Sequence, residues 1–264
     1  MSIRFALVQL IPSLIVGAQA RRSEVEDAPV TVRFSEGIVH GFLLLRNDAG
    51  AILARGDLRQ TRQGDTVESR ITFRFRDGSL IEESVAYTQQ RVFTMRAYHL
   101  VLRGPVFEED SEIRMNRARG TYQVTTVAHK DGKKEVHEGS LDLPPDTYNG
   151  MVLTVLKNLP KGGIGKIHVV AFTPKPRIVR VEIASDGGHR VLLDETERQA
   201  VHYVLKPKLG TVTGLLAKLL GRMPPDNHAW ILEDEVPAFV RFVGSLYAGG
   251  PIWTIEQTTL RWPD

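Results

Sequence analysis

The chain has 264 residues, of which 42% are hydrophobic and 25% are charged, a composition typical of a globular protein. It contains no cysteine, which excludes disulfides, thiolate nucleophiles, cysteine-ligated zinc and iron–sulfur clusters. The net charge is only +3 and the basic residues are scattered among acidic ones, so the sequence gives no electrostatic footprint for nucleic acid.

The first twenty residues have the three parts of a secretory signal. A basic start is followed by an apolar run at 5–17, and Ala18 and Ala20 place small residues before an expected cleavage site. A helix that spans a membrane needs about 20 apolar residues, so this shorter run predicts no stable membrane span. We therefore expect residues 1–20 to be a signal peptide and the protein to be exported to the bacterial periplasm or the cell exterior.

Alternating apolar and polar residues, the period-2 pattern of half-buried strands, recur along the rest of the chain. The clearest runs are 30–34, 70–76, 178–185, 239–244 and 253–257. Turn-forming residues separate such runs at 47–50, 77–78, 131–132 and 186–188. The pattern predicts a mainly β protein: an antiparallel meander that forms a barrel or half-barrel in a single domain, 21–264, with 142–150 as the best candidate for a subdivision.

Two segments have the spacing of short apolar helices instead. The first, 148–159, carries a stripe that includes Tyr148, Met151 and Val155, and Asp146 is its expected N-cap. The second, 212–220, carries an equivalent stripe made of Val212, Leu215, Leu216, Leu219 and Leu220. Short helices are unstable alone, so both are expected to pack on the concave face of the sheet, either as core or as a lid over a ligand cavity.

Motifs for nucleotide and metal binding are absent. The sequence KGGIGKIHVV lacks the spacing of a phosphate-binding loop and runs into a strand, which excludes ATP and GTP binding there. His129 and His137 flank the turn at 131–132 and are expected on opposite faces of a hairpin. We therefore predict no metal site, and no pattern indicates a cofactor.

The densest group of polar and aromatic residues follows the second helical segment. Asp226 and His228 have a spacing that would let a carboxylate orient an imidazole for base catalysis, with Arg241 as an anion contact. A structural interpretation, in which Asp226 caps a turn and His228 lies at the sheet edge, explains the same residues, and we favour it over catalysis. They remain weak catalytic candidates.

The motifs LPPDTYNGM, LKNLPKG and YVLKPKLG, together with LLGRMPPDNHAW and LYAGGPIW, resemble a family of uncharacterised exported bacterial β-rich proteins. The resemblance covers about the second half of the mature chain and implies a compartment and a fold. The expected architecture is also similar, more distantly, to the half-barrels of periplasmic lipoprotein carriers, which implies acyl chains sheltered under helical lids. Likeness of fold alone is a weak guide to function.

Three hypotheses of function are open, and the third, a structural module, has no distinctive sequence pattern of its own. The favoured one is a non-enzymatic exported protein that binds a hydrophobic or amphiphilic ligand, such as lipid or lipoprotein acyl chains, between the sheet and the two helices. Its expected ligand-binding residues are Tyr148, Met151, Val155, Leu215, Leu216, Leu219, Trp230 and Trp253. The alternatives are a hydrolase that uses the Asp226/His228 region and a structural module of a cell-envelope assembly.

Overall fold

The computed structural model describes residues 28–160, 163–172, 176–193, 196–208, 224–258 and 260–261. The predicted signal peptide and the predicted helix at 212–220, with Leu215, Leu216 and Leu219, lie outside these residues. In the described part of the chain, no helix is long and apolar enough to cross a membrane.

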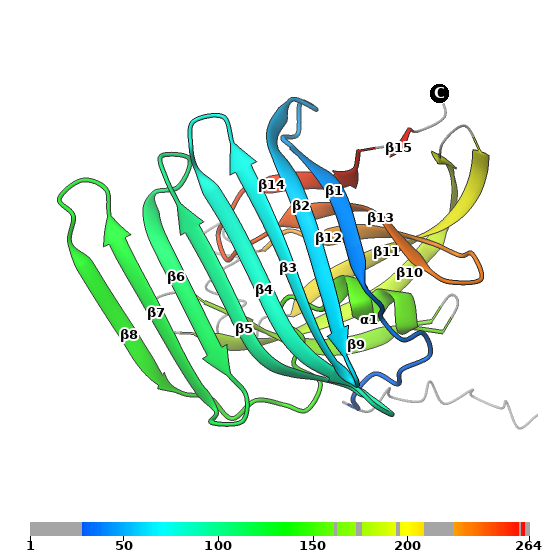
Figure 1. The fold of residues 1–264 in the computed structure, drawn as a ribbon, viewed down its shortest axis with the longest axis horizontal. Coiled ribbons are helices and arrows are strands. Elements are labelled where there is room, and N and C mark those ends of the chain that lie inside the picture. The colour runs from blue at the N-terminus through cyan, green and yellow to red at the C-terminus, as the bar shows by residue number, and fades with distance from the viewer. Residues whose placement is uncertain are drawn as a thin grey trace, which may run out of the picture.

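Fifteen strands and one helix make up the described residues (Figure 1). The first eight strands are β1 (Val39–Arg46), β2 (Ile52–Gln63), β3 (Thr66–Phe75), β4 (Leu80–Gln89), β5 (Phe93–Arg103), β6 (Glu109–Asn116), β7 (Thr121–Ala128) and β8 (Lys134–Ser140). The helix and the remaining strands are α1 (Val152–Asn158), β9 (Gly165–Ala171), β10 (Arg177–Leu193), β11 (Thr196–Lys208), β12 (Asn227–Leu232), β13 (Ala238–Ser245), β14 (Ile252–Gln257) and β15 (Leu260–Arg261).

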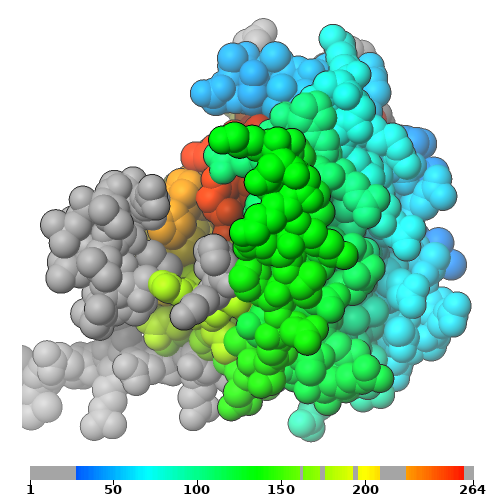
Figure 2. All heavy atoms as spheres, turned by 90° about the vertical axis from the view of Figure 1, so that its left-hand side faces the viewer, coloured from blue at the N-terminus to red at the C-terminus, as the bar shows by residue number. Residues whose placement is uncertain are grey.

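All strands belong to one antiparallel sheet, as the meander pattern predicts. Its order is β15-β10-β11-β12-β13-β14-β1-β2-β3-β4-β5-β6-β7-β8, and β9 pairs with β10. The sheet folds over itself, so that β1–β8 lie in front of β9–β14 and α1 lies near one end (Figure 1). Among the described strands it does not close, because β8 pairs with β7 alone; the β8 edge faces the viewer in Figure 2. The mainly β antiparallel meander is therefore confirmed, and the sheet is not a closed barrel.

The core fills the space between the two layers. Alternation decides which side chains enter it: on β3, Phe73 and Phe75 are buried while Arg70 and Arg74 are exposed. The apolar face of α1 joins the same core, and Tyr148, Met151, Val155 and Leu156 are each at most 1% exposed. One hydrophobic cluster thus receives residues from both layers and from the helix.

Three local predictions were wrong. The helix begins at Val152 rather than near 148, because residues before it form a turn with Gly150 at a φ of 70°, and Met151 rather than Asp146 occupies the N-cap. Asp186-Gly187-Gly188 is no turn but a bulge within β10, where the register with β11 shifts. The run at 30–34 is no strand, and Thr31 makes only an isolated bridge with Val92.

Side chains, rather than a neighbouring strand, satisfy part of the backbone of this N-terminal run. Asn158 Oδ1 accepts the N–H groups of Arg33 and Phe34 at 2.8 and 2.7 Å, and the hydroxyl of Tyr148 accepts the N–H of Val30 at 2.8 Å. Residues 30–34 are thus attached to α1 and to the turn before it, which explains why the alternating pattern misleads there.

Candidate functional site

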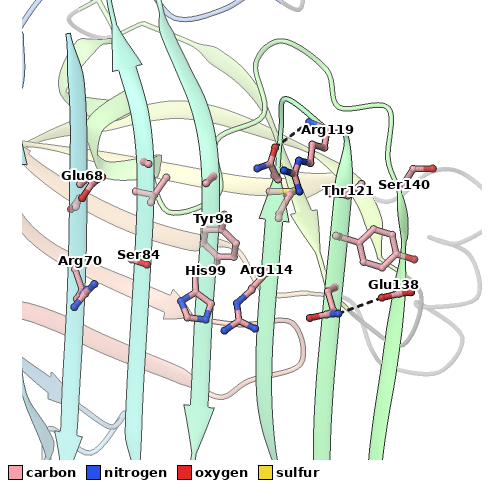
Figure 3. Close-up of a pocket in the computed structure, with 18 of the residues that line it drawn as sticks. Glu68, Arg70, Ser84, Tyr98, His99, Arg114, Arg119, Thr121, Glu138 and Ser140 are labelled. Atoms are coloured by element: carbon pink, nitrogen blue, oxygen red, sulfur yellow. Dashed lines mark hydrogen bonds between the residues drawn. The ribbon is translucent and has the colours of Figure 1, made fainter. Parts of the chain in front are cut away.

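A wide, open hollow lies across β2–β8, mainly on the polar face that points away from the core, and three core residues, Val85, Tyr98 and Met115, also border it. Its volume is about 1220 Å³. It is lined by residues of all seven strands and of the β6–β7 turn: Arg59, Thr61, Glu68, Ser69, Arg70, Ser84, Val85, Ala86, Ala97, Tyr98, His99, Arg114, Met115, Asn116, Arg119, Thr121, Tyr122, Gln123, Glu138, Gly139 and Ser140 (Figure 3). We call this hollow the polar-face groove.

One wall of the groove is a row of basic and polar residues that crosses the strands. Its members are successive register partners, one from each strand: Arg59, Arg70, Ser84, His99, Arg114, Gln123 and Glu138. Residues directly opposite each other in a sheet project from the same face, so the row presents its side chains together. Figure 3 shows Arg70, His99 and Arg114 projecting side by side from β3, β5 and β6.

The floor is the next row on the same face, two residues further along each strand. It contains Thr61, Glu68, Ala86, Ala97, Asn116, Thr121 and Ser140, most of which are small. The groove exists because these short side chains stand beside long arginines. Its floor offers the methyl groups of Ala86 and Ala97 but also the carboxylate of Glu68, whereas its wall offers hydrogen-bond donors as far as the carboxylate of Glu138.

Carboxylates on the far side of the wall hold the basic side chains in place. Arg59 Nε lies 3.0 Å from Asp57 Oδ1, His99 Nε2 lies 2.9 Å from Glu112 Oε1, and Arg114 also pairs with Glu112. The hydrogen bond from His99 lowers the pKa of Glu112, with help from the positive charge of Arg114. A guanidinium has five N–H donors, so a single carboxylate partner leaves donors for a ligand.

An acidic side chain lies on the core face behind this wall. The hydroxyl of Tyr98 donates to Glu83 Oε1 at 2.9 Å. Burial among apolar residues raises the pKa of Glu83, and burial also raises the pKa of Tyr98 well above its ordinary value. Burial therefore shifts both groups toward their neutral forms, which suits a hydrogen bond at the edge of the core.

The structure places the predicted ligand-binding residues away from the groove. Tyr148, Met151 and Val155 are fully packed in the core, and Trp253 is 5% exposed there, beside Phe75. A ligand would reach them in this structure only if the core opened. A second hollow, of about 50 Å³, borders α1 and is far below the 300–1,000 Å³ that is usual for ligand pockets.

The weak catalytic candidates do not form a dyad in this structure. The nearest charged partner of Asp226 is Lys206, at 3.9 Å, and no hydrogen bond joins Asp226 to His228 in the described residues. His228 Nδ1 lies 3.0 Å from His202 Nε2 instead. Arg241 lies over the ring of Trp230, 5.6 Å from its centroid.

A cluster of imidazoles around Trp230 was missed by sequence reasoning. His202 stacks on Trp230 with ring centroids 4.4 Å apart, His189 packs edge-on against His202, and Asp186 Oδ2 lies 3.3 Å from His202 Nδ1. Burial is the main cause that lowers the pKa of His202, and the nearby His228 adds to it. Only the strand register brings these residues together; in the described residues, no three His, Asp or Glu side chains form a metal-binding group.

A buried pair of hydrogen-bonded side chains was also missed by sequence reasoning. Asp146 is fully buried, and both of its carboxylate oxygens accept from Nδ1 of His168, at 2.8 and 2.9 Å. The neighbouring Asn149 side chain bonds both the N–H and the C=O of Val170. These hydrogen bonds attach the segment between β8 and α1 to β9, so its buried polar side chains stabilise the fold.

Comparison with known proteins gives a faint likeness of fold. No family model and no curated protein matches the chain. The chain is similar to the crystal structure of a β-barrel-like protein of the domain of unknown function DUF1849 from Brucella abortus, at 9% identity and a TM-score of 0.43, over 88% of this chain and 100% of that one. It is also similar to a DUF1089 family protein from Pseudomonas aeruginosa, at 14% identity and a TM-score of 0.32, over 68% of this chain and 84% of that one.

Proposed function

We propose that this chain is an exported, non-enzymatic binding protein that holds an elongated amphiphilic ligand with an anionic group in the polar-face groove. The observation that carries the proposal is the pairing of two rows across β2–β8: a floor with small side chains and a wall with three arginines and a histidine. No similar combination of size and chemistry occurs beside α1, where the neighbouring hollow is small.

The two rows contact different parts of the proposed ligand. Methyl groups of Ala86 and Ala97 provide apolar contact, which contributes about 25 cal/mol per Å² removed from water. Arg70 and Arg114 provide charge-assisted hydrogen bonds to an anionic group, each worth about 1.5–3 kcal/mol. The groove crosses seven strands, so it suits a long ligand better than a compact one.

This proposal keeps the ligand class that the sequence suggested and moves the site. Acyl chains between α1 and the sheet would have to displace Met151 and Val155, which already fill that space. A hydrolase at Asp226 and His228 is less favoured, because the partners of these residues are Lys206 and His202. We include export in the proposal because residues 1–20 have the pattern of a signal peptide. N-terminal sequencing of the secreted protein should then give a sequence that begins at Arg21.

The binding proposal is tested by titrating the protein with two amphiphiles below their micelle-forming concentrations. Lysophosphatidylglycerol carries a net negative charge and lysophosphatidylcholine does not, so the wild type should bind the first more tightly. Arg70→Ala and Arg114→Ala should each weaken that binding about tenfold, and Ala97→Trp should abolish it by filling the floor.

Arg74→Ala is the matched control, since Arg74 is exposed on the same face of β3 and lies outside the groove. It should bind both amphiphiles as the wild type does. The proposal fails if the wild type binds neither probe, or if Ala97→Trp and Arg70→Ala leave binding unchanged. Native mass spectrometry of gently purified protein provides an independent measure of a co-purifying amphiphile.

A further inference from the structure

The β8 edge of the sheet is open. Every residue of β8 is exposed, and of the strands that the structure describes it pairs with β7 alone. In Figure 2, which looks onto this side of the molecule, no other described element covers the strand. An exposed edge presents unpaired N–H and C=O groups and is a ready site for pairing with another strand.

The ladder with β7 shows which backbone groups face outward. Ala128 N–H donates to Lys133 O at 3.0 Å, and Leu141 N–H donates to Gly120 O at 2.7 Å. Hydrogen-bonded pairs alternate along an antiparallel ladder, so the odd-numbered residues of β8 bond to β7. The N–H and C=O groups of Lys134, Val136 and Glu138 therefore point away from the sheet.

The order of charges along β8 selects one register of self-pairing. We propose that β8 pairs antiparallel with β8 of a second copy of this chain, with Val136 opposite Val136 on the two-fold axis. Lys134 then lies opposite Glu138, and Glu135 lies opposite His137, each twice by symmetry. Opposite charges placed directly across a sheet stabilise it by about 0.2–1 kcal/mol per pair.

The adjacent registers lack this complementarity. Centring the pair on Lys134, Glu135 or Glu138 places like charges opposite each other, and centring it on His137 places Val136 opposite Glu138. The proposed register also uses the outward-facing groups of Lys134, Val136 and Glu138, and it covers the Val136 side chain, which is 48% exposed. Charged residues on an edge strand usually prevent pairing, but here they restrict it to one partner and one register.

Pairing through β8 would also place two polar-face grooves on the same face of the joined sheet, offset from each other along the strands. Glu138, Gly139 and Ser140 line the groove at the open edge, so a second copy would add its own groove across the two-fold axis. The interface is a single strand, and interfaces below about 1,200 Å² are weak, so we expect a reversible dimer with micromolar or weaker affinity.

Sedimentation velocity over a range of protein concentrations tests the dimer with a charge-exchange design. Lys134→Glu and Glu138→Lys each create like-charge pairs in a homodimer. The dissociation constant of each single variant's dimer should therefore be at least tenfold higher than that of the wild type. An equimolar mixture of the two variants should dimerise again, because every pair in the heterodimer is then of opposite charge. The double variant should also dimerise as the wild type does.

Rescue in the mixture separates pairing from misfolding, since a variant that failed to fold could not recover by mixing. Val136→Pro, which removes an outward N–H and leaves the ladder with β7 intact, should abolish the dimer. A wild type that stays monomeric at every concentration overturns the proposal. So does a wild-type dimer that the single variants do not weaken, or one that the mixture does not restore.

Discussion

His168 donates to both carboxylate oxygens of Asp146, a side chain with no exposure to solvent. The imidazole itself is 14% exposed, so the pair lies at the boundary of the core, between β9 and the turn that precedes α1. Removing one partner of a buried pair leaves an uncompensated polar group, which is more costly than losing a surface contact.

We therefore expect His168→Ala to lower the free energy of unfolding by about 3 kcal/mol. His99→Ala is the control, because its partner Glu112 is 25% exposed, and breaking such a pair should cost less than about 1 kcal/mol. Urea denaturation followed by tryptophan fluorescence measures both. Equal costs would contradict a structural role for the Asp146–His168 pair.

The side chain of Asn158 attaches residues 33–34 to the end of α1. Asn158→Ala removes the acceptor of two backbone N–H groups, which should cost about 2 kcal/mol of stability. Hydrogen exchange at the amides of Arg33 and Phe34 should accelerate strongly. Exchange within β3 and β4 should accelerate only as much as the loss of global stability requires. Unchanged protection at Arg33 and Phe34 would contradict the contact.

Glu83 should make stability depend on pH in an unusual direction. Its folded pKa lies above the unfolded value near 4.5, so the folded state keeps a proton that the unfolded state releases. This contribution favours folding below the unfolded pKa and is lost as the pH rises through the folded pKa.

Glu83→Gln removes that titration, so its stability relative to wild type should increase as the pH rises above the unfolded value. Denaturation curves at a series of pH values provide the measurement. A wild type that gains stability relative to Glu83→Gln as the pH rises would contradict the neutral carboxyl.

Gly150 is required where the chain enters α1. Its φ of 70° lies in the left-handed region, and an added Cβ would approach the side chains of Val85 and Tyr98 to 3.1 and 3.3 Å. Gly150→Ala should therefore cost about 1–3 kcal/mol. Gly132 also has a positive φ but open space around it, so Gly132→Ala should reduce stability less. Melting temperatures from thermal denaturation would rank the two variants.

Much of the fold could be predicted, because alternation is a local property. The pattern at 70–76 identified β3 and its buried phenylalanines, since period 2 decides which face each side chain takes. The stripe that begins at Tyr148 identified a helix with the correct buried face, but not where it starts. Asp146 and Asn149 fix the turn before that start through bonds to His168 and Val170 of β9, a strand that lies later in the chain.

The candidate site could not be found by reading motifs, because its residues share no sequence pattern. Arg70, His99 and Arg114 come from three strands and meet only through register. One signal was available: the tight turn at Gly64-Asp65 places Arg59 opposite Arg70. The same counting fails between β4 and β5, because a bulge at Ala86/Tyr87 shifts the register by one residue before Ser84 meets His99.

The sequence by itself determined the strand and helix faces and the absence of cysteine chemistry, since composition and periodicity depend only on neighbouring residues. The tertiary structure decided which residues meet across the sheet, where the sheet stays open, and that α1 fills the core. Those outcomes depend on register and packing between distant segments, and no local pattern specifies them.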